Sequence, residues 1–464
     1  MMDRPEERIR TLAERKVDRL EILRIGAKLG LSLTALTAIL SEVDLSTAAA
    51  TKLEWPVASR EPAAPVTISV AHAWEASFMP RQIQFDKEFM KRHPNIIVKA
   101  ENTPWGSFLT KYLTQAAGGS LPDLMYVHFS WIQNFIKLKT VISLDPYIAN
   151  QHDFNIGDFT KPSLVAYRSR KDNHLYGIPY DTGPIVLFYN KDIFDKAKMA
   201  YPNESWTLDR MKQAAQELTH GTGPSKVFGF VGVQGPGATD LGPIGLYPFG
   251  ARYVNEYAET KCYLTEPAAV SALEWWYDFY KKGIAPSPAQ VATMPGGDVF
   301  LFGRAAMMPN GSWATPGLNQ NAKFKWDMTY WPRGPKAHST AAEGSCYSIT
   351  ASSQQKDAAW LYLNEYLSPA GQIFMWASTG RGSPARNSAW PAYLSSKFAP
   401  KHARVVQESL NTFARPDVMM SPMAHKATTA AQAVWDNVIA GRMTVPQALK
   451  QICSTIEPIL AANM

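Results

Sequence analysis

The stretch VTISVA at residues 66–71 opens the part of the chain that decides the fold. It is a short run of β-branched and small apolar residues, as in a buried strand. The stretch after it has apolar residues at helical spacing, namely Ile83, Phe85, Phe89 and Met90. The segments that follow predict a helix over 80–93, a strand over 95–100, a helix over 105–117 and a strand over 123–127. This β-α-β-α-β order predicts a mainly parallel sheet.

The rest of the chain continues the alternation of strands and helices. Strands are expected near 187–189 and 227–233, and helices after Thr207 and over 265–283, 357–367 and 428–439. A length of 464 residues exceeds one ordinary core, so two lobes are expected. Hydrophobic residues make up 46% and charged residues 19%, which excludes a disordered or collagen-like chain.

The net charge bears on nucleic-acid binding, and the cysteine content bears on disulfides and metal sites. The net charge of +7 is spread along the chain without a basic block, so we expect no nucleic-acid partner. The three cysteines, Cys262, Cys346 and Cys453, are unclustered and odd in number. We therefore expect buried thiols, with neither a disulfide framework nor a metal site.

The first 50 residues are typical of an export signal. An Arg-rich stretch reaches Lys28, an apolar run follows over 29–40, and small residues over 46–50 suit a signal peptidase. The apolar run is too short to span a bilayer. The alternative is an amphipathic helix that stays attached to the chain. Residues 51–65 contain three prolines and predict a flexible leader, and we expect the protein in the periplasm.

The common catalytic and cofactor motifs are missing. The Gly235-Pro236-Gly237 loop lacks the third glycine of a dinucleotide loop, and its proline removes a backbone donor. The sequence has neither GxxxxGK[ST] nor GxSxG, and its histidines lack metal-ligand spacing. We expect no cofactor and no metal.

Aromatic residues instead recur beside polar residues after the predicted strands, where open parallel sheets bind ligands. Sugars need flat apolar surfaces for their CH faces and polar groups for their hydroxyls, and this mixture supplies both. Of the 14 tryptophans, we expect four to contact the ligand. The candidate residues are Trp74, Glu75, Ser130, Trp131, Tyr180, Asp181, Tyr247, Phe249, Trp313 and Trp331. Paired carboxylates among Glu75, Asp123 and Asp181 leave a secreted glycoside hydrolase as the alternative function, although Asp123 is more simply a Pro-Asp turn.

Several motifs resemble the extracellular solute-binding proteins of ABC sugar importers, the family that includes maltose-binding protein. They extend from about residue 66 to the end of the chain. They are PDLMY at 122–126, LDP at 144–146, YGIPY at 176–180, FYNKDIF at 188–194, SWT at 205–207, FGRAAM at 302–307, NGSW at 310–313 and the C-terminal run 430–456.

The resemblance implies an α/β fold of two lobes joined by crossing hinge segments, with a sugar bound in the cleft between them. It implies a first lobe of residues 66–180 plus 336–394 and a second of 181–335 plus 395–464. It adds Ser345 and Arg381 to the candidate site. The implied function is binding of a sugar or related polyhydroxy solute, without catalysis, by lobe closure and delivery to a membrane permease. We expect a monomer.

Overall fold

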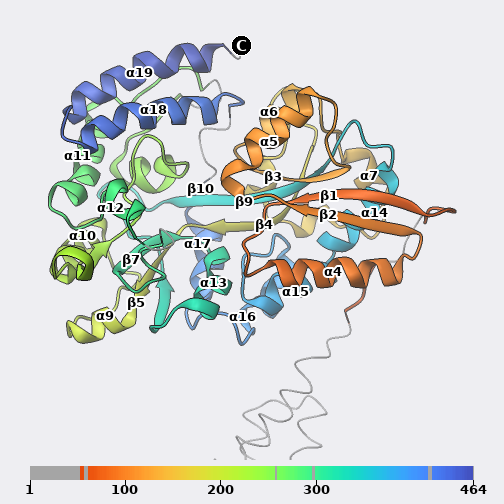
Figure 1. Cartoon of the computed structure of the whole chain (residues 1–464), viewed down its shortest axis with the longest axis horizontal. Coiled ribbons are helices and arrows are strands. Elements are labelled where there is room, and N and C mark those ends of the chain that lie inside the picture. Colours follow the sequence, from red (N-terminus) through yellow and green to blue (C-terminus); the bar gives the residue numbers. More distant parts are fainter. Residues whose placement is uncertain (1–52, 57–60, 256–258, 295–297, 416–420, 463–464) are drawn as a thin grey trace, which may run out of the picture. The chain divides into compact units, whose positions relative to one another are not determined.

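The computed structural model describes residues 53–56, 61–255, 259–294, 298–415 and 421–462 (Figure 1). The predicted export signal lies outside this part. The strands are β1 (Val66–His72), β2 (Ile96–Asn102), β3 (Leu124–His128), β4 (Ile178–Pro184), β5 (Val186–Asn190), β6 (Phe228–Phe230), β7 (Ala305–Asn310), β8 (Trp326–Thr329), β9 (Thr340–Ile349) and β10 (Ala414–Arg415).

The helices begin with α4 in the numbering of Figure 1. They are α4 (Met79–Arg92), α5 (Trp105–Ala117), α6 (Ile132–Lys137), α7 (Asp145–Asn150), α8 (Lys161–Val165), α9 (Lys191–Lys196), α10 (Leu208–Leu218), α11 (Pro267–Lys281), α12 (Pro288–Ala292), α13 (Thr315–Asn321), α14 (Lys356–Leu367), α15 (Pro369–Met375), α16 (Trp390–Leu394), α17 (Arg404–Thr412), α18 (Ala424–Ile439) and α19 (Val445–Ala461), with a π-helix, η3 (Leu241–Leu246). Of the described helices, none has the length and apolar character that a membrane span requires.

The predicted β-α-β-α-β start is confirmed as β1, α4, β2, α5 and β3. These strands belong to a sheet with the order β10-β9-β3-β1-β2, and β4 also pairs with β9. β1 is parallel to β2 and β3, but β9 is antiparallel to β3 and β4, so the sheet is mixed rather than mainly parallel. Figure 1 shows α4 and α15 on one side of this sheet and α5 and α6 on the other.

The second sheet has the order β6-β7-β5-β8 and is buried on both faces. Successive side chains of β5 alternate between two apolar cores, as strand geometry requires. Leu187 and Tyr189 pack in a core with α10 and α11, whereas Val186 and Phe188 pack in a core with α17. This burial on both faces accounts for the continuous apolar sequence of the strand.

Crossings at β4–β5 and at β8–β9 join the sheets. The chain passes from β4 in the first sheet to β5 in the second through the single residue Ile185. It returns between β8 and β9, and β4 and β9 then pair along most of the length of β4. These paired strands are the predicted crossing segments, whereas the lobe boundaries at 180, 335 and 394 stay a prediction.

Helix α4 differs from its predicted amphipathic pattern. Its buried face contains Phe85 and Phe89, as expected, but also the polar side chains of Gln82 and Asp86. Ile83, which was expected among the apolar residues of this face, is 46% exposed. The buried polar pair faces α14 and the back of the candidate site, as described below.

The expectation of unpaired cysteines is wrong for two of the three. Cys262 and Cys453 form a disulfide, with their Cα atoms 5.2 Å apart, and only Cys346 is a buried free thiol. The bridge ties α19 to the segment before α11, within a core that contains α11, α18 and α19. A separation of 191 residues hid the pairing, because sequence spacing does not show which distant elements are adjacent. A disulfide agrees with the predicted export to an oxidising compartment.

Removing the bridge with the pair Cys262→Ser and Cys453→Ser should lower the free energy of unfolding by about 2–5 kcal/mol, because the unfolded chain regains the conformations that the cross-link removes. Urea denaturation measures the change. Thiol titration of the denatured wild type should find one thiol before reduction and three afterwards. Three thiols before reduction would contradict the assignment.

Candidate functional site

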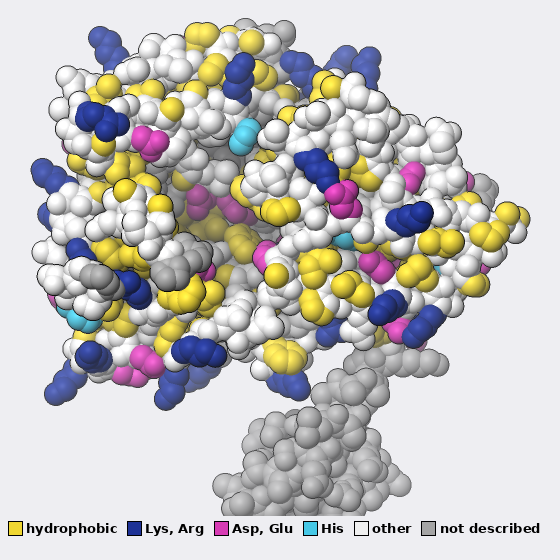
Figure 2. Space-filling model, viewed as in Figure 1, with side chains coloured by type: hydrophobic (Ala, Val, Ile, Leu, Met, Phe, Trp, Pro, Cys, Tyr) yellow, Lys and Arg dark blue, Asp and Glu magenta, His cyan; other side chains and the backbone are white. Residues whose placement is uncertain are grey.

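A cavity of about 440 Å³ lies where the two sheets meet. Figure 2 shows this face of the molecule hollowed, with acidic and apolar side chains inside the hollow. The residues come from the loop after β1, the start of α5, β3, the paired strands β4 and β9, the loop after α15, and loops of the second sheet. The lining residues are Ala73, Trp74, Glu75, Pro104, Trp105, Tyr126, His128, Tyr180, Asp181, Thr239, Trp313, Glu343, Gly344, Ser345 and Arg381.

The structure brings together seven of the twelve predicted site residues in this cavity. They are Trp74, Glu75, Tyr180, Asp181, Trp313, Ser345 and Arg381. Two more, Ser130 and Trp131, line an adjoining crevice of about 60 Å³ that shares Trp105 and Thr239 with the cavity. The crevice is also lined by residues of α5 and α18.

The other three predicted residues lie elsewhere. Trp331 is fully buried, donates its indole N–H to the backbone oxygen of Ile244 and stacks on a helix α11 tryptophan. Phe249 packs against Trp275 of the same helix, with ring centroids 5.3 Å apart. Tyr247 lies beside Arg415. Sequence position after a strand predicted that these side chains would face the cavity, but it does not fix the direction in which a side chain points.

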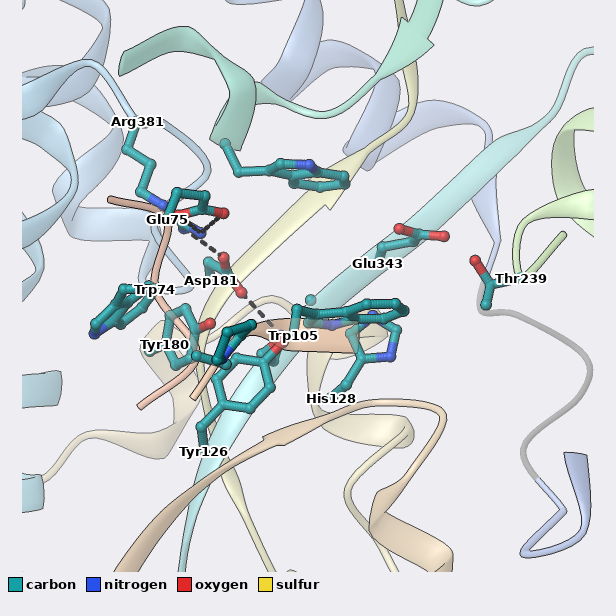
Figure 3. A pocket seen from close by; sticks show the side chains of 15 residues that line it. Trp74, Glu75, Trp105, Tyr126, His128, Tyr180, Asp181, Thr239, Glu343 and Arg381 are labelled. Atoms are coloured by element: carbon teal, nitrogen blue, oxygen red, sulfur yellow. Dashed lines mark hydrogen bonds and ion pairs between the residues drawn. The ribbon is translucent and has the colours of Figure 1, made fainter. Parts of the chain in front are cut away.

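Trp105 is the main lining residue that the sequence analysis missed. It begins α5 directly after β2, and 46% of it is exposed. In Figure 3 its indole lies across one side of the open space. Its position after β2 repeats that of Trp74 after β1, and this repetition was the available signal. Trp105 is assigned to a helix by its sequence and so is not counted among the loop residues that follow strands. As the first residue of α5, however, it adjoins the loop after β2 and can face the cavity as a loop residue does.

Of the tryptophans that line the cavity, Trp105 and Trp313 have the most exposed surface. Trp313 is half-buried and comes from the second sheet, just after β7, whereas Trp105 comes from the first. Trp313 packs over Gly311, where a Cβ would lie 2.0 Å from its ring. Trp74, by contrast, is only 4% exposed and forms part of the wall. Each sheet thus supplies one indole surface to the cavity.

Arg381 is buried at one end of the cavity, where it forms a charged cluster with Asp181 and Glu75 (Figure 3). Its Nη1 donates to Asp181 Oδ2 at 2.9 Å, and its Nη2 lies 3.3 Å from Glu75 Oε1. The guanidinium also lies 4.9 Å from the ring centroid of Trp74 and 5.1 Å from that of Phe78. Two carboxylates and two aromatic faces therefore fix the position of this cation.

Asp181 is occupied by protein partners on both oxygens. Its Oδ1 accepts the backbone N–H of Ser345 at 2.8 Å, and its Oδ2 accepts Arg381. Burial raises the pKa of Asp181 to about 6, while the Arg381 guanidinium and the Ser345 N–H limit the rise. Its carboxylate therefore positions Arg381 and β9 more than it offers hydrogen bonds to a ligand.

Neutral polar groups and one further acidic side chain, Glu343, complete the wall. Burial lowers the pKa of His128 to about 3, so its imidazole is neutral at ordinary pH, and its Nδ1 lies 2.8 Å from Ser130 Oγ. Ser345 Oγ donates to the hydroxyl of Tyr126 at 2.8 Å. In Figure 3, Thr239 and Glu343 lie on the side of the open space away from Arg381. Within the described residues, no group of His, Cys, Asp and Glu could hold a metal ion.

The Trp74 indole is hydrogen-bonded to the side-chain amide of Gln82 on the side away from the cavity. Gln82 Oε1 accepts the indole N–H of Trp74 at 2.9 Å and the hydroxyl of Tyr366 at 2.7 Å. Gln82 Nε2 donates to Asp86 Oδ1 at 2.8 Å and to the hydroxyl of Tyr362 at 2.9 Å. All four hydrogen-bonding positions of this buried amide are used, which fixes both its orientation and that of the indole.

The chain belongs to the family described as bacterial extracellular solute-binding protein, whose model matches residues 84–401. A Brucella abortus relative described as a binding protein is 26% identical over 318 residues, which are 66% of this chain and 73% of the relative. The galactooligosaccharide-binding protein of Bacillus subtilis is 24% identical over 302 residues, 63% of this chain and 68% of the relative.

Solved structures show the same fold. The ABC substrate-binding protein of Listeria monocytogenes in complex with cycloalternan aligns with a TM-score of 0.77 at 24% identity, covering 86% of this chain and 99% of that one. The predicted two-lobed α/β binding-protein fold and family resemblance are thus confirmed.

Replacing Asp86 with asparagine tests the polar network behind Trp74. Burial raises the pKa of Asp86 from 3.8 to about 6, opposed by hydrogen bonds from Tyr362 and Gln82. Because the folded pKa is the higher one, the contribution of Asp86 to stability is present below about pH 4 and is lost as pH rises through 6. The Asp86→Asn variant should therefore gain up to about 3 kcal/mol relative to wild type between pH 4 and pH 8.

Urea unfolding at the two pH values measures this gain. The matched control is Asp357→Asn, which changes an exposed carboxylate of α14. A difference between wild type and Asp86→Asn that does not vary with pH would contradict the account of Asp86.

Proposed function

We propose that this protein is the exported binding component of an ABC importer that takes up a sugar or related polyhydroxy solute. The observation that carries the proposal is the cavity in which each sheet supplies one indole surface, Trp105 and Trp313, beside buried polar groups. Indole faces cover the CH faces of pyranose rings, and the polar wall serves their hydroxyls. Membership of the family and relatives named for oligosaccharides support it.

Binding would act through closure of the two lobes. A ligand that contacts both Trp105 and Trp313 favours the closed arrangement only by the contacts that it gains there. A shift from mostly open to mostly closed needs about 5 kcal/mol of differential affinity, which two stacked indoles and a few buried hydrogen bonds could supply. The closed form would then be the one that a membrane permease receives, and a single copy suffices for this action.

The carboxylates support binding rather than glycoside hydrolysis. Asp123 lies outside the cavity lining and accepts the N–H and hydroxyl of Ser69 and the hydroxyl of Ser353. This is the turn role expected for a Pro-Asp pair before a strand. Glu75 and Asp181 both bind Arg381. Neither is thus arranged as the separate acid and nucleophile that hydrolysis uses.

Titration with a sugar panel, followed by tryptophan fluorescence and calorimetry, tests the proposal. At least one sugar should bind the wild type, and Trp105→Ala and Trp313→Ala should each weaken that sugar at least about tenfold, because each removes a stacking face. Trp331→Phe is the matched control, since it changes a core tryptophan outside the cavity. No response to any sugar, or equal affinity in all three variants, would overturn the proposal.

A further inference from the structure

Arg381 is the one cationic side chain among the described residues that line the cavity. A guanidinium at the end of a ligand site normally suggests recognition of an anion, such as a carboxylate or a phosphate. The net charge of +7 points the same way at first sight. The surroundings of Arg381 decide whether its charge is available.

Two carboxylates occupy the guanidinium. Asp181 binds Nη1 at 2.9 Å with a side chain that is 8% exposed, so it is part of the wall. Glu75 binds Nη2 at 3.3 Å with a side chain that is 47% exposed, so it lies at the boundary of the open space. Trp74 and Phe78 lie within about 5 Å of the guanidinium carbon. A ligand group that approaches Arg381 from the cavity therefore meets Glu75 (Figure 3).

We propose that Glu75 sets the charge selectivity of the cavity, so that it accepts neutral sugars and rejects uronates and sugar phosphates. This inference rests on the proposed function and names the substrate class within it. One positive charge faces two negative ones, so the cluster presents no net positive charge to an incoming anion. An anion that reached Nη2 would either lie beside Glu75, which places like charges together, or displace it, which breaks the Glu75–Arg381 ion pair.

We assign the charge selectivity to Glu75 rather than to Asp181 because the two carboxylates differ in their other contacts. Asp181 also accepts the Ser345 N–H, so its loss would disturb β9 as well as the charge. Among the described residues, the Glu75 carboxylate accepts side-chain hydrogen bonds from Arg381 alone. Replacing its carboxylate by an amide of the same shape changes the charge and little else.

The test compares wild type with Glu75→Gln by calorimetry, using three ligand pairs: glucose and glucuronate, galactobiose and digalacturonate, and glycerol and sn-glycerol 3-phosphate. Wild type should bind the neutral member at least about tenfold tighter in any pair that it binds. Glu75→Gln should bind at least one anionic probe about tenfold tighter than wild type does, because the net charge of the Arg381 cluster then rises from −1 to zero and no longer repels an anion. That gain should shrink with added salt.

Glu101→Gln is the matched control, since it removes the same charge from an exposed residue that pairs with Lys111 outside the cavity. It should leave the affinity for every anionic probe unchanged. The inference is overturned if wild type binds an anionic member as tightly as its neutral counterpart, or if Glu75→Gln gains no anion affinity. A gain for Glu75→Gln without any sugar binding to wild type would support the role of Glu75 and overturn the proposed function instead.

Discussion

The antiparallel pairing of β4 with β9 is the constraint on which the cavity depends. Asp181 pairs with Ser345 across these strands, and the register shifts between Pro179 and Asp181. Such an irregularity turns side chains that a regular strand would send to opposite faces. The strands also approach closely, since a Cβ at Gly344 would lie 2.5 Å from the backbone oxygen of Asp181. Glycine at this position is therefore a condition for bringing the cavity wall together.

From this pairing, a continuous series of polar contacts leads away from the cavity. Asp181 holds Arg381, Arg381 covers Trp74, and the Trp74 indole donates to Gln82, which is bound in turn by the buried groups of α4 and α14. Buried polar groups cost free energy unless every hydrogen bond is made, so a network of this kind favours one geometry over its near alternatives. It gives a largely buried tryptophan a defined orientation at the end of the cavity.

The sequence predicts the bounds of the first strands and helices within one or two residues, and those of α5 without error. It does so because short strand-like runs alternate there with segments of helical apolar spacing. The site is predicted less well. Trp74, Trp313 and Trp331 all follow strands, but only the first two line the cavity, whereas Trp331 points into the core. The apolar spacing of α4 selected Ile83, whereas Gln82 is buried, because its partners come from residues about 280 positions away. Contacts at such separations, like the Cys262–Cys453 bridge, leave no periodic signal.

Net charge and local charge lead to opposite expectations for the ligand. The excess of seven positive charges is distributed over the whole chain and attracts anions only at long range, where salt at physiological strength screens it within about 8 Å. At the cavity the separations are shorter than this, and acidic side chains outnumber the one guanidinium: two carboxylates lie within 3.3 Å of it, and Glu343 lies across the open space. Burial of Arg381 strengthens these short contacts relative to the distant ones, because fewer water molecules lie between the charges. The composition of the chain therefore bears on how ligands approach, whereas the selectivity that we propose depends on the paired charges at Arg381.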